Sequence, residues 1–213
     1  MEARSMVNHW VEAPEWLNGR QLWAFYLTFD GASALHDFAA AHQSRLAGFD
    51  GLDLVDRRWL HLTIQGAAFT DQMEPESYEL LVRAVAKLTL QEPAIDLVVQ
   101  RPRPSRDAVV MQAIPSHPLD SLRDRLRSAA TAALGTDELY ALPEPVGGFN
   151  PHITVAYVRP PEPQAADVAA AMEEVALPDI RVRVPHLSLV RLSRGTSDWT
   201  WDAEERFPLS GSV

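Results

Sequence analysis

The chain has 213 residues, and 29 acidic against 19 basic residues give it a formal charge of −10, which argues against a protein that wraps long duplex nucleic acid. The absence of cysteine excludes disulfides, thiol chemistry and cysteine zinc sites. Neither a long apolar run nor a secretory signal is present, so we expect a cytoplasmic protein that does not associate with membranes.

The first half of the chain is predicted to alternate strands and helices after an extension. Residues 1–20 precede the first periodic element and are expected to be an N-terminal extension, and residues 21–213 are expected to form one domain. The patterns predict a strand at 21–30, a helix at 32–46, a strand at 58–69, a helix at 76–90, strands at 94–100 and 107–114 around an exposed loop RPRPSR, and a helix at 117–134.

The second half repeats much of this order. A loop, LPEPVGGFNP, leads into a strand at 151–158, a helix at 165–175, and strands at 180–192 and 199–209 around RGTSD. In each half a strand that carries His-x-Thr is followed by a helix and a β-hairpin, and the two histidines, His61 and His152, lie 91 residues apart. We infer an approximate duplication, which rests on element order and on these short matches.

The two His-x-Thr strands, in WLHLTIQGA and NPHITVAYV, should each bury an aliphatic side and present polar groups on the other. Alternate residues of a strand share a face. The faces expected to be shared are His61, Thr63 and Gln65 in the first strand, and His152, Thr154 and Ala156 in the second, opposite Ile153, Val155 and Tyr157.

A pseudo-twofold that joins the two strands would place two imidazoles and two hydroxyls around one point. Such a site suits a phosphate, because the hydroxyls can donate to non-bridging oxygens while one imidazole acts as base and the other as acid near neutral pH. In-line displacement at a phosphodiester needs that pair of groups, and it does not require a metal.

Other features favour structural roles. A third match, His186-Leu187-Ser188, has no twin in the other half, so His186 is expected to be structural. The alternative is that His186 lines the same groove.

The aromatic residues of 21–30 are expected to pack in the core rather than stack on a base, and Trp199 and Trp201 are expected to pack against a sheet. The arginines of RPRPSR are expected to be solvated, although a basic cluster can hold a small anion. The histidines expected at the surface or as caps are His9, His36, His42 and His117.

WLHLTIQGAAF and FNPHITVAYV resemble the two signature strands of the two-histidine (2H) phosphoesterases, the superfamily that includes 2'-5' RNA ligase-like proteins and cyclic phosphodiesterases. The element order over 21–209 is similar as well. The resemblance implies a bilobal α+β fold with a pseudo-twofold, in which each lobe is an antiparallel sheet with helices outside and a central groove lies between the lobes. It also implies a phosphoesterase without metal or cofactor that acts on a 2',3'-cyclic phosphate or on an RNA-end 2'-5' phosphodiester, with a small nucleotide or RNA terminus as its partner.

By the same resemblance, His61 and His152 would be the acid and the base, in an order left open, and Thr63 and Thr154 would hold the phosphate. The chain departs from the family at Tyr157, where RNA ligase members often have an arginine. Arg159 or an arginine of the hairpin at 181–194 is the expected replacement.

Two further functions compete with this one. The first is a nucleotide-binding module that keeps the groove without turnover. The second is a zinc protein in which His61, His152 and His186 converge, ranked last because no acidic residue lies at ligand spacing beside them. The physiological substrate, the choice between hydrolysis and ligation, and the oligomeric state are left open.

Overall fold

The computed structural model describes residues 5–135, 139–140 and 148–210. The strands are β1 (Gln21–Thr28), β2 (Leu52–Leu54), β3 (His61–Phe69), β4 (Ile95–Val99), β5 (Arg103–Pro104), β6 (Ala108–Ile114), β7 (His152–Val158), β8 (Ile180–Val184), β9 (His186–Arg194) and β10 (Trp199–Pro208). The helices are α1 (Ser33–Leu46), α2 (Pro75–Thr89), α3 (His117–Leu134) and α4 (Ala165–Glu173), with 3-10 turns η1 (Pro14–Gly19), η2 (Arg57–Trp59) and η3 (Thr70–Gln72).

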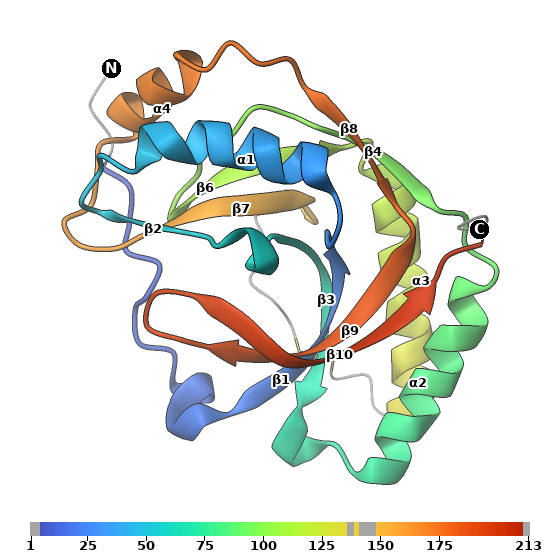
Figure 1. The fold of residues 1–213 in the computed structure, drawn as a ribbon. Helices are drawn as coiled ribbons and strands as arrows, with labels where there is room; N and C mark the ends of the chain where they lie inside the picture. The colour runs from blue at the N-terminus through green and yellow to red at the C-terminus, as the bar shows by residue number, and fades with distance from the viewer. Residues whose placement is uncertain (1–4, 136–138, 141–147, 211–213) are drawn as a thin grey trace.

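One curled antiparallel sheet runs through the molecule in the order β10-β9-β1-β3-β7-β6-β4-β8, with β2 added to β7 and β5 added to β6. Helices α1 and α4 lie together on one side of the molecule and α2 and α3 on another (Figure 1). The mixed α+β class, with an antiparallel sheet and helices outside it, is therefore confirmed.

The sheet consists of two groups of strands that meet between β3 and β7. The group β10-β9-β1-β3 contacts α2 and α3, whereas the group that begins at β7 contacts α1 and α4. Between β3 and β7 one residue pair, Leu62 with Ile153, is in register. The two groups are continuous through this narrow junction, so the strands form one sheet.

The helices form where the apolar spacing predicts them. Helix α1 buries residues three and four apart, and these pack into the main core. Helix α3 ends at Gly135, whose φ of 67° is the left-handed conformation that glycine adopts at helix ends. No helix in the described part of the chain is long and apolar enough to cross a membrane.

The strand predicted at 180–192 is wrong, because the segment forms two strands on different parts of the sheet. Pro185 lies between them and cannot donate an N–H to a ladder. Strand β8 pairs with β4, whereas β9 pairs with β1 and β10, so the closing hairpin is β9–β10 alone. The structure also adds the short β2, and it adds β5 inside the segment RPRPSR that was expected to be a loop.

The described residues of the N-terminal segment lie along the body of the protein. The backbone amides of Met6 and His9 donate to the carbonyls of Pro163 and Val158, and the Met6 side chain is buried in the main core. Most of the loop predicted at 142–151 lies outside the described residues.

Candidate active site

The junction of β3 and β7 brings the two His-x-Thr motifs together. Because the strands are antiparallel and Leu62 faces Ile153, His61 lies opposite Thr154 and Thr63 lies opposite His152. Directly opposed residues share a face of the sheet, and diagonal neighbours such as His61 and His152 have Cα atoms about 7–8 Å apart in a regular pair. All four side chains are therefore gathered on one face, around a local twofold.

Both imidazoles are held by the same hydrogen bond. His61 Nδ1 lies 2.7 Å from the Trp59 carbonyl, and His152 Nδ1 lies 2.7 Å from the Asn150 carbonyl. A carbonyl only accepts, so Nδ1 carries the hydrogen in each ring and the lone pair of the neutral ring is on Nε2. Among the described residues nothing hydrogen-bonds either Nε2, so both are available to a substrate.

The two histidines differ in burial. His61 is 9% exposed, lies parallel to Tyr26 with ring centroids 4.2 Å apart, and meets Trp201 edge-on. Burial lowers the pKa of His61 to about 4; the bond to the Trp59 carbonyl opposes this shift, and nearby His152 adds to it. His152 is exposed. His61 is therefore neutral at neutral pH, with its lone pair on Nε2.

Each threonine lies beside a tyrosine. The Thr63 hydroxyl is a hydrogen-bond partner of the Tyr26 phenol, and the Thr154 hydroxyl is a hydrogen-bond partner of the Tyr157 phenol. Burial raises the pKa of both phenols, and the adjacent hydroxyls only partly oppose this rise. Both tyrosines therefore stay protonated and can donate hydrogen bonds.

Tyr157 reaches this face because of a β-bulge, which corrects the expected alternation along β7. Val109 pairs with Ala156, and the next residue of β6, Val110, pairs with Thr154, so Val155 is an extra residue. The bulge returns Tyr157 to the face of Thr154 and turns Ala156 away from it.

The first motif has the matching irregularity. Thr63 pairs with Tyr26, whereas Gln65 pairs with the core residue Phe25, so Ile64 is the extra residue in β3. Gln65 was expected to share the face of His61, and this expectation is wrong. Its side chain donates to the carbonyls of Gly66 and Tyr140.

His186 belongs to a polar network beside the motifs. Its Nε2 lies 3.1 Å from the Thr28 hydroxyl, and Thr28 is the cross-strand neighbour of His61. The hydroxyls of Thr28 and Ser188 both reach one oxygen of Glu204. Burial lowers the pKa of His186. Within the described ranges, no three His, Asp or Glu side chains are grouped to hold a metal.

Aromatic residues and histidines from distant segments complete the surroundings, contrary to several expectations. Tyr26 and Trp201 surround His61 instead of packing only against the sheet. His9 is not a surface residue: its Nδ1 lies 2.9 Å from Asp107, its Nε2 accepts from Trp199, and its ring tilts over Tyr157. His42 is buried in α1, where it donates to the Phe38 carbonyl.

Of the arginines expected to replace the family's arginine, all but Arg181 are bonded elsewhere. Arg159 donates to Asp53, and Arg194 donates to the carbonyls of His9 and Val11. On the same hairpin segment, Arg183 pairs with Asp96 and Arg191 with Asp202.

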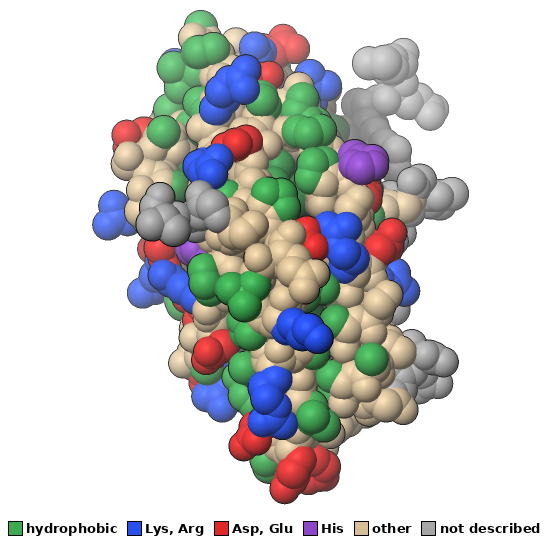
Figure 2. Space-filling view, turned by 90° about the vertical axis from the view of Figure 1, so that its right-hand side faces the viewer, with side chains coloured by type: hydrophobic (Ala, Val, Ile, Leu, Met, Phe, Trp, Pro, Cys, Tyr) green, Lys and Arg blue, Asp and Glu red, His purple; other side chains and the backbone are tan. Residues whose placement is uncertain are grey.

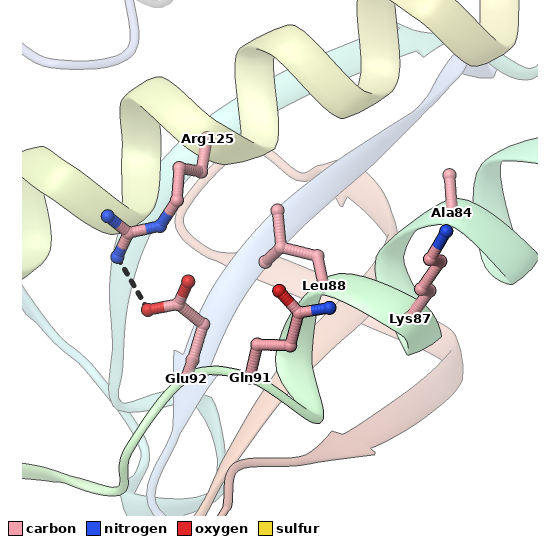
Figure 3. Close-up of a pocket in the computed structure, with 6 residues that line it drawn as sticks. All are labelled: Ala84, Lys87, Leu88, Gln91, Glu92 and Arg125. Carbon is pink, nitrogen blue, oxygen red and sulfur yellow. Dashed lines mark hydrogen bonds and ion pairs between the residues drawn. The ribbon is translucent and has the colours of Figure 1, made fainter.

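Two cavities on the described surface can be compared with the position of the motifs. One of about 120 Å³ is lined by Gln100, Arg101, Arg103, Val110 and Gln112, beside the second motif. The other, of about 230 Å³, lies between α2 and α3 and contains the ion pair of Arg125 with Glu92 but no motif residue (Figure 3). Figure 2 shows the side of the molecule where α2 and α3 lie, on which the described basic and acidic side chains are interspersed. Of these two cavities, the first lies beside the candidate site.

Comparison with solved structures identifies the same fold in several proteins. TT0787 of Thermus thermophilus is similar at 20% identity and a TM-score of 0.67, with 90% of this chain and 98% of that chain covered. Escherichia coli LigT is similar at 18% identity, with 90% of this chain and 99% of that chain covered; the TM-score is 0.61 for its complex with 3'-AMP and 0.59 for its complex with NADP+. No curated protein matches this chain significantly.

A family model settles the relationship that these structures suggest. It describes the 2'-5' RNA ligase superfamily, a group of two-histidine phosphoesterases, and it matches residues 24–196, a range that contains both His-x-Thr motifs and most of the sheet. The protein therefore belongs to the 2'-5' RNA ligase superfamily.

Proposed function

We propose that the protein is a metal-independent phosphoesterase that acts on a 2',3'-cyclic phosphate or on a related RNA-end 2'-5' phosphodiester. The observation that carries this proposal is the matched pair of imidazoles. Both rings donate through Nδ1 to a carbonyl two residues upstream, and both leave Nε2 for a ligand on one face of the sheet.

The burial of His61 suggests how the roles are divided. A neutral His61 is the general base that removes a proton from water as the water oxygen bonds to phosphorus. His152 is the general acid: in its imidazolium form it keeps Nδ1–H on the Asn150 carbonyl and gives its Nε2 proton to the departing ribose oxygen as the other phosphorus–oxygen bond breaks. The product is a phosphomonoester beside a free ribose hydroxyl, and each proton taken by one ring is matched by one given by the other. Ligation would be the same ring opening, with a ribose hydroxyl of a second RNA end in place of water as the attacking group.

The remaining polar groups fit the phosphate. Thr63 and Thr154 hold non-bridging oxygens, and the protonated phenols of Tyr26 and Tyr157 supply further donors without adding positive charge. The E. coli LigT structures with 3'-AMP, NADP+ and ATP support a small nucleotide or an RNA terminus as the ligand.

The test is hydrolysis of adenosine 2',3'-cyclic phosphate in excess chelator. The variants His61→Asn and His152→Asn keep a donor near the Nδ1 position and lose Nε2, so each should lower kcat by about a hundredfold or more. His117→Asn is the control, because His117 is exposed at the start of α3.

Each contrary outcome has its own meaning. Activity that disappears only with chelator would overturn the metal-independent mechanism. Nucleotide binding without product would identify a binding module instead of an enzyme.

A further inference from the structure

The cavity lined by Gln112 and Val110 lies next to the second motif of the candidate active site. Across β6 and β7, Gln112 pairs with His152 and Val110 pairs with Thr154, so both lining residues lie on the face of the motif. Arg103 pairs with Val110 across β5 and β6, which places Arg103 one strand further out on the same face. The cavity thus begins about one strand spacing, roughly 4.8 Å, from the second motif.

Gln112 in the lining of the cavity is hydrogen-bonded to the residues just before His152. The side-chain amide of Gln112 donates to Asn150 Oδ1 at 2.6 Å and to the Pro151 carbonyl at 2.8 Å. Asn150 in turn provides the carbonyl that holds His152 Nδ1. The segment Asn150–Pro151 therefore bonds both to Gln112 in the cavity wall and to the imidazole of His152.

Two arginines, Arg101 and Arg103, line the cavity. Most described arginines form ion pairs: Arg20 with Asp71, Arg45 with Glu174, Arg58 with Asp56, Arg83 with Glu79, Arg125 with Glu92, Arg159 with Asp53, Arg183 with Asp96, Arg191 with Asp202, and Arg206 with Asp30 and Glu204.

Arg101 and Arg103 lie outside that group, as do Arg57, Arg106, Arg127, Arg181 and Arg194, and Arg101 and Arg103 are the two of these that line the cavity. No acidic side chain among the described residues pairs with either guanidinium, and Asp179 accepts only from the backbone amide of Arg101. Two guanidinium groups at one polar cavity have the hydrogen-bond geometry to hold an anion.

We propose that this arginine subsite, formed by Gln100, Arg101, Arg103 and Gln112, binds a second phosphate of the substrate. The proposal rests on the proposed function, in which the first phosphate lies between His61 and His152. The preferred substrate is then a 2',3'-cyclic phosphate whose nucleotide carries another phosphate on its 5' side, rather than a nucleoside 2',3'-cyclic phosphate. The guanidinium fork matches phosphate oxygens, and the small cavity limits the subsite to one such group.

The experiment compares kcat/KM for adenosine 2',3'-cyclic phosphate with that for the same compound carrying a 5'-phosphate. A dinucleotide with a 2',3'-cyclic end forms a third arm, because its internucleotide phosphate is a diester and the 5'-phosphate is a monoester. The wild type should prefer a substrate with the second phosphate by about tenfold or more. The double variant Arg101→Ala/Arg103→Ala should reduce that preference to about one. Arg127→Ala, which removes an exposed arginine from α3, should keep the preference.

Failure of the subsite and failure of the proposed function give different results. Equal kcat/KM for all three substrates in the wild type, or a preference that survives in the double variant, overturns the subsite while the phosphoesterase activity stands. If no substrate is turned over, the binding of adenosine 3',5'-bisphosphate and of 3'-AMP decides the matter. Tighter binding of the bisphosphate by the wild type but not by the double variant supports the subsite, and equal binding overturns it.

Discussion

His61 and His152 are diagonal neighbours across β3 and β7, and each donates its Nδ1 hydrogen to the carbonyl two residues before it. The backbone thus fixes the same tautomer in both rings. The surroundings of the two rings differ, because Tyr26 and Trp201 enclose His61 whereas His152 is exposed. Equal hydrogen bonding with unequal burial is the basis for the proposed division of the two rings into base and acid.

The burial of His61 predicts an unusual pH profile. Because the pKa of His61 lies at about 4, kcat/KM for a 2',3'-cyclic nucleotide should be maintained as the pH falls from 7 to 5 and should decline only near pH 4. Trp201→Ala exposes the imidazole, so its pKa should rise toward 6.5 and the acid limb should move upward with it. Trp23→Ala is the control, since Trp23 packs on Tyr78. A wild-type acid limb at pH 6.5 would contradict the assignment of His61 as the base.

The two threonines are predicted to contribute equally. Thr63→Val and Thr154→Val keep the shape of the side chain but lose the hydroxyl, so each should lower kcat/KM by about tenfold through the loss of a donor to the phosphate. Serine at either position should restore most of the activity. The measurement is steady-state kinetics on the cyclic nucleotide, with Thr131→Val on α3 as the control. A valine variant with full activity would remove that threonine from the site.

The sequence predicted the features that depend on neighbouring residues. The alternation within a strand placed His61 with Thr63 and His152 with Thr154, and the repeated element order indicated that the two strands are equivalent. The prediction for Tyr157 was wrong, because a bulge at Val155 reverses the alternation of faces along β7. No residue type in the strand indicates that a bulge occurs there. A similar bulge at Ile64 removes Gln65 from the site.

Long-range packing explains the other failures. Pro185 could have been taken as the end of a strand, but the sequence does not say that β8 joins β4 while β9 joins β1. Likewise, the sequence does not say that β5 pairs with β6, which places Arg103 beside the second motif.

The low pKa of His61 also predicts that the protein loses stability in mild acid. The unfolded chain binds a proton at His61 below pH 6.5, whereas the folded chain binds it only near pH 4, so the free energy of unfolding should decrease as the pH falls through this window. The decrease should reach up to about 3 kcal/mol from this residue, and burial lowers the pKa of His42 and His186 in the same direction. Urea unfolding of His61→Asn should show a shallower dependence on pH than the wild type or His117→Asn. An identical slope in all three proteins would show that His61 is not buried as a neutral ring.

His9 is predicted to fasten the N-terminal segment against the edge of the site. It bonds both Asp107 and Trp199, and it is the main cause of the lowered pKa of Asp107. His9→Ala leaves two partly buried polar groups without their partner, so the free energy of unfolding should fall by about 1–3 kcal/mol. The pKa of Asp107, followed by NMR, should rise toward its ordinary value of 3.8 because the burial that remains opposes ionisation. His117→Ala should change neither quantity. If His9→Ala left both the stability and the Asp107 titration unchanged, the segment would be held by its backbone bonds and by Met6 alone, and the contact of His9 with Tyr157 would have no part in shaping the site.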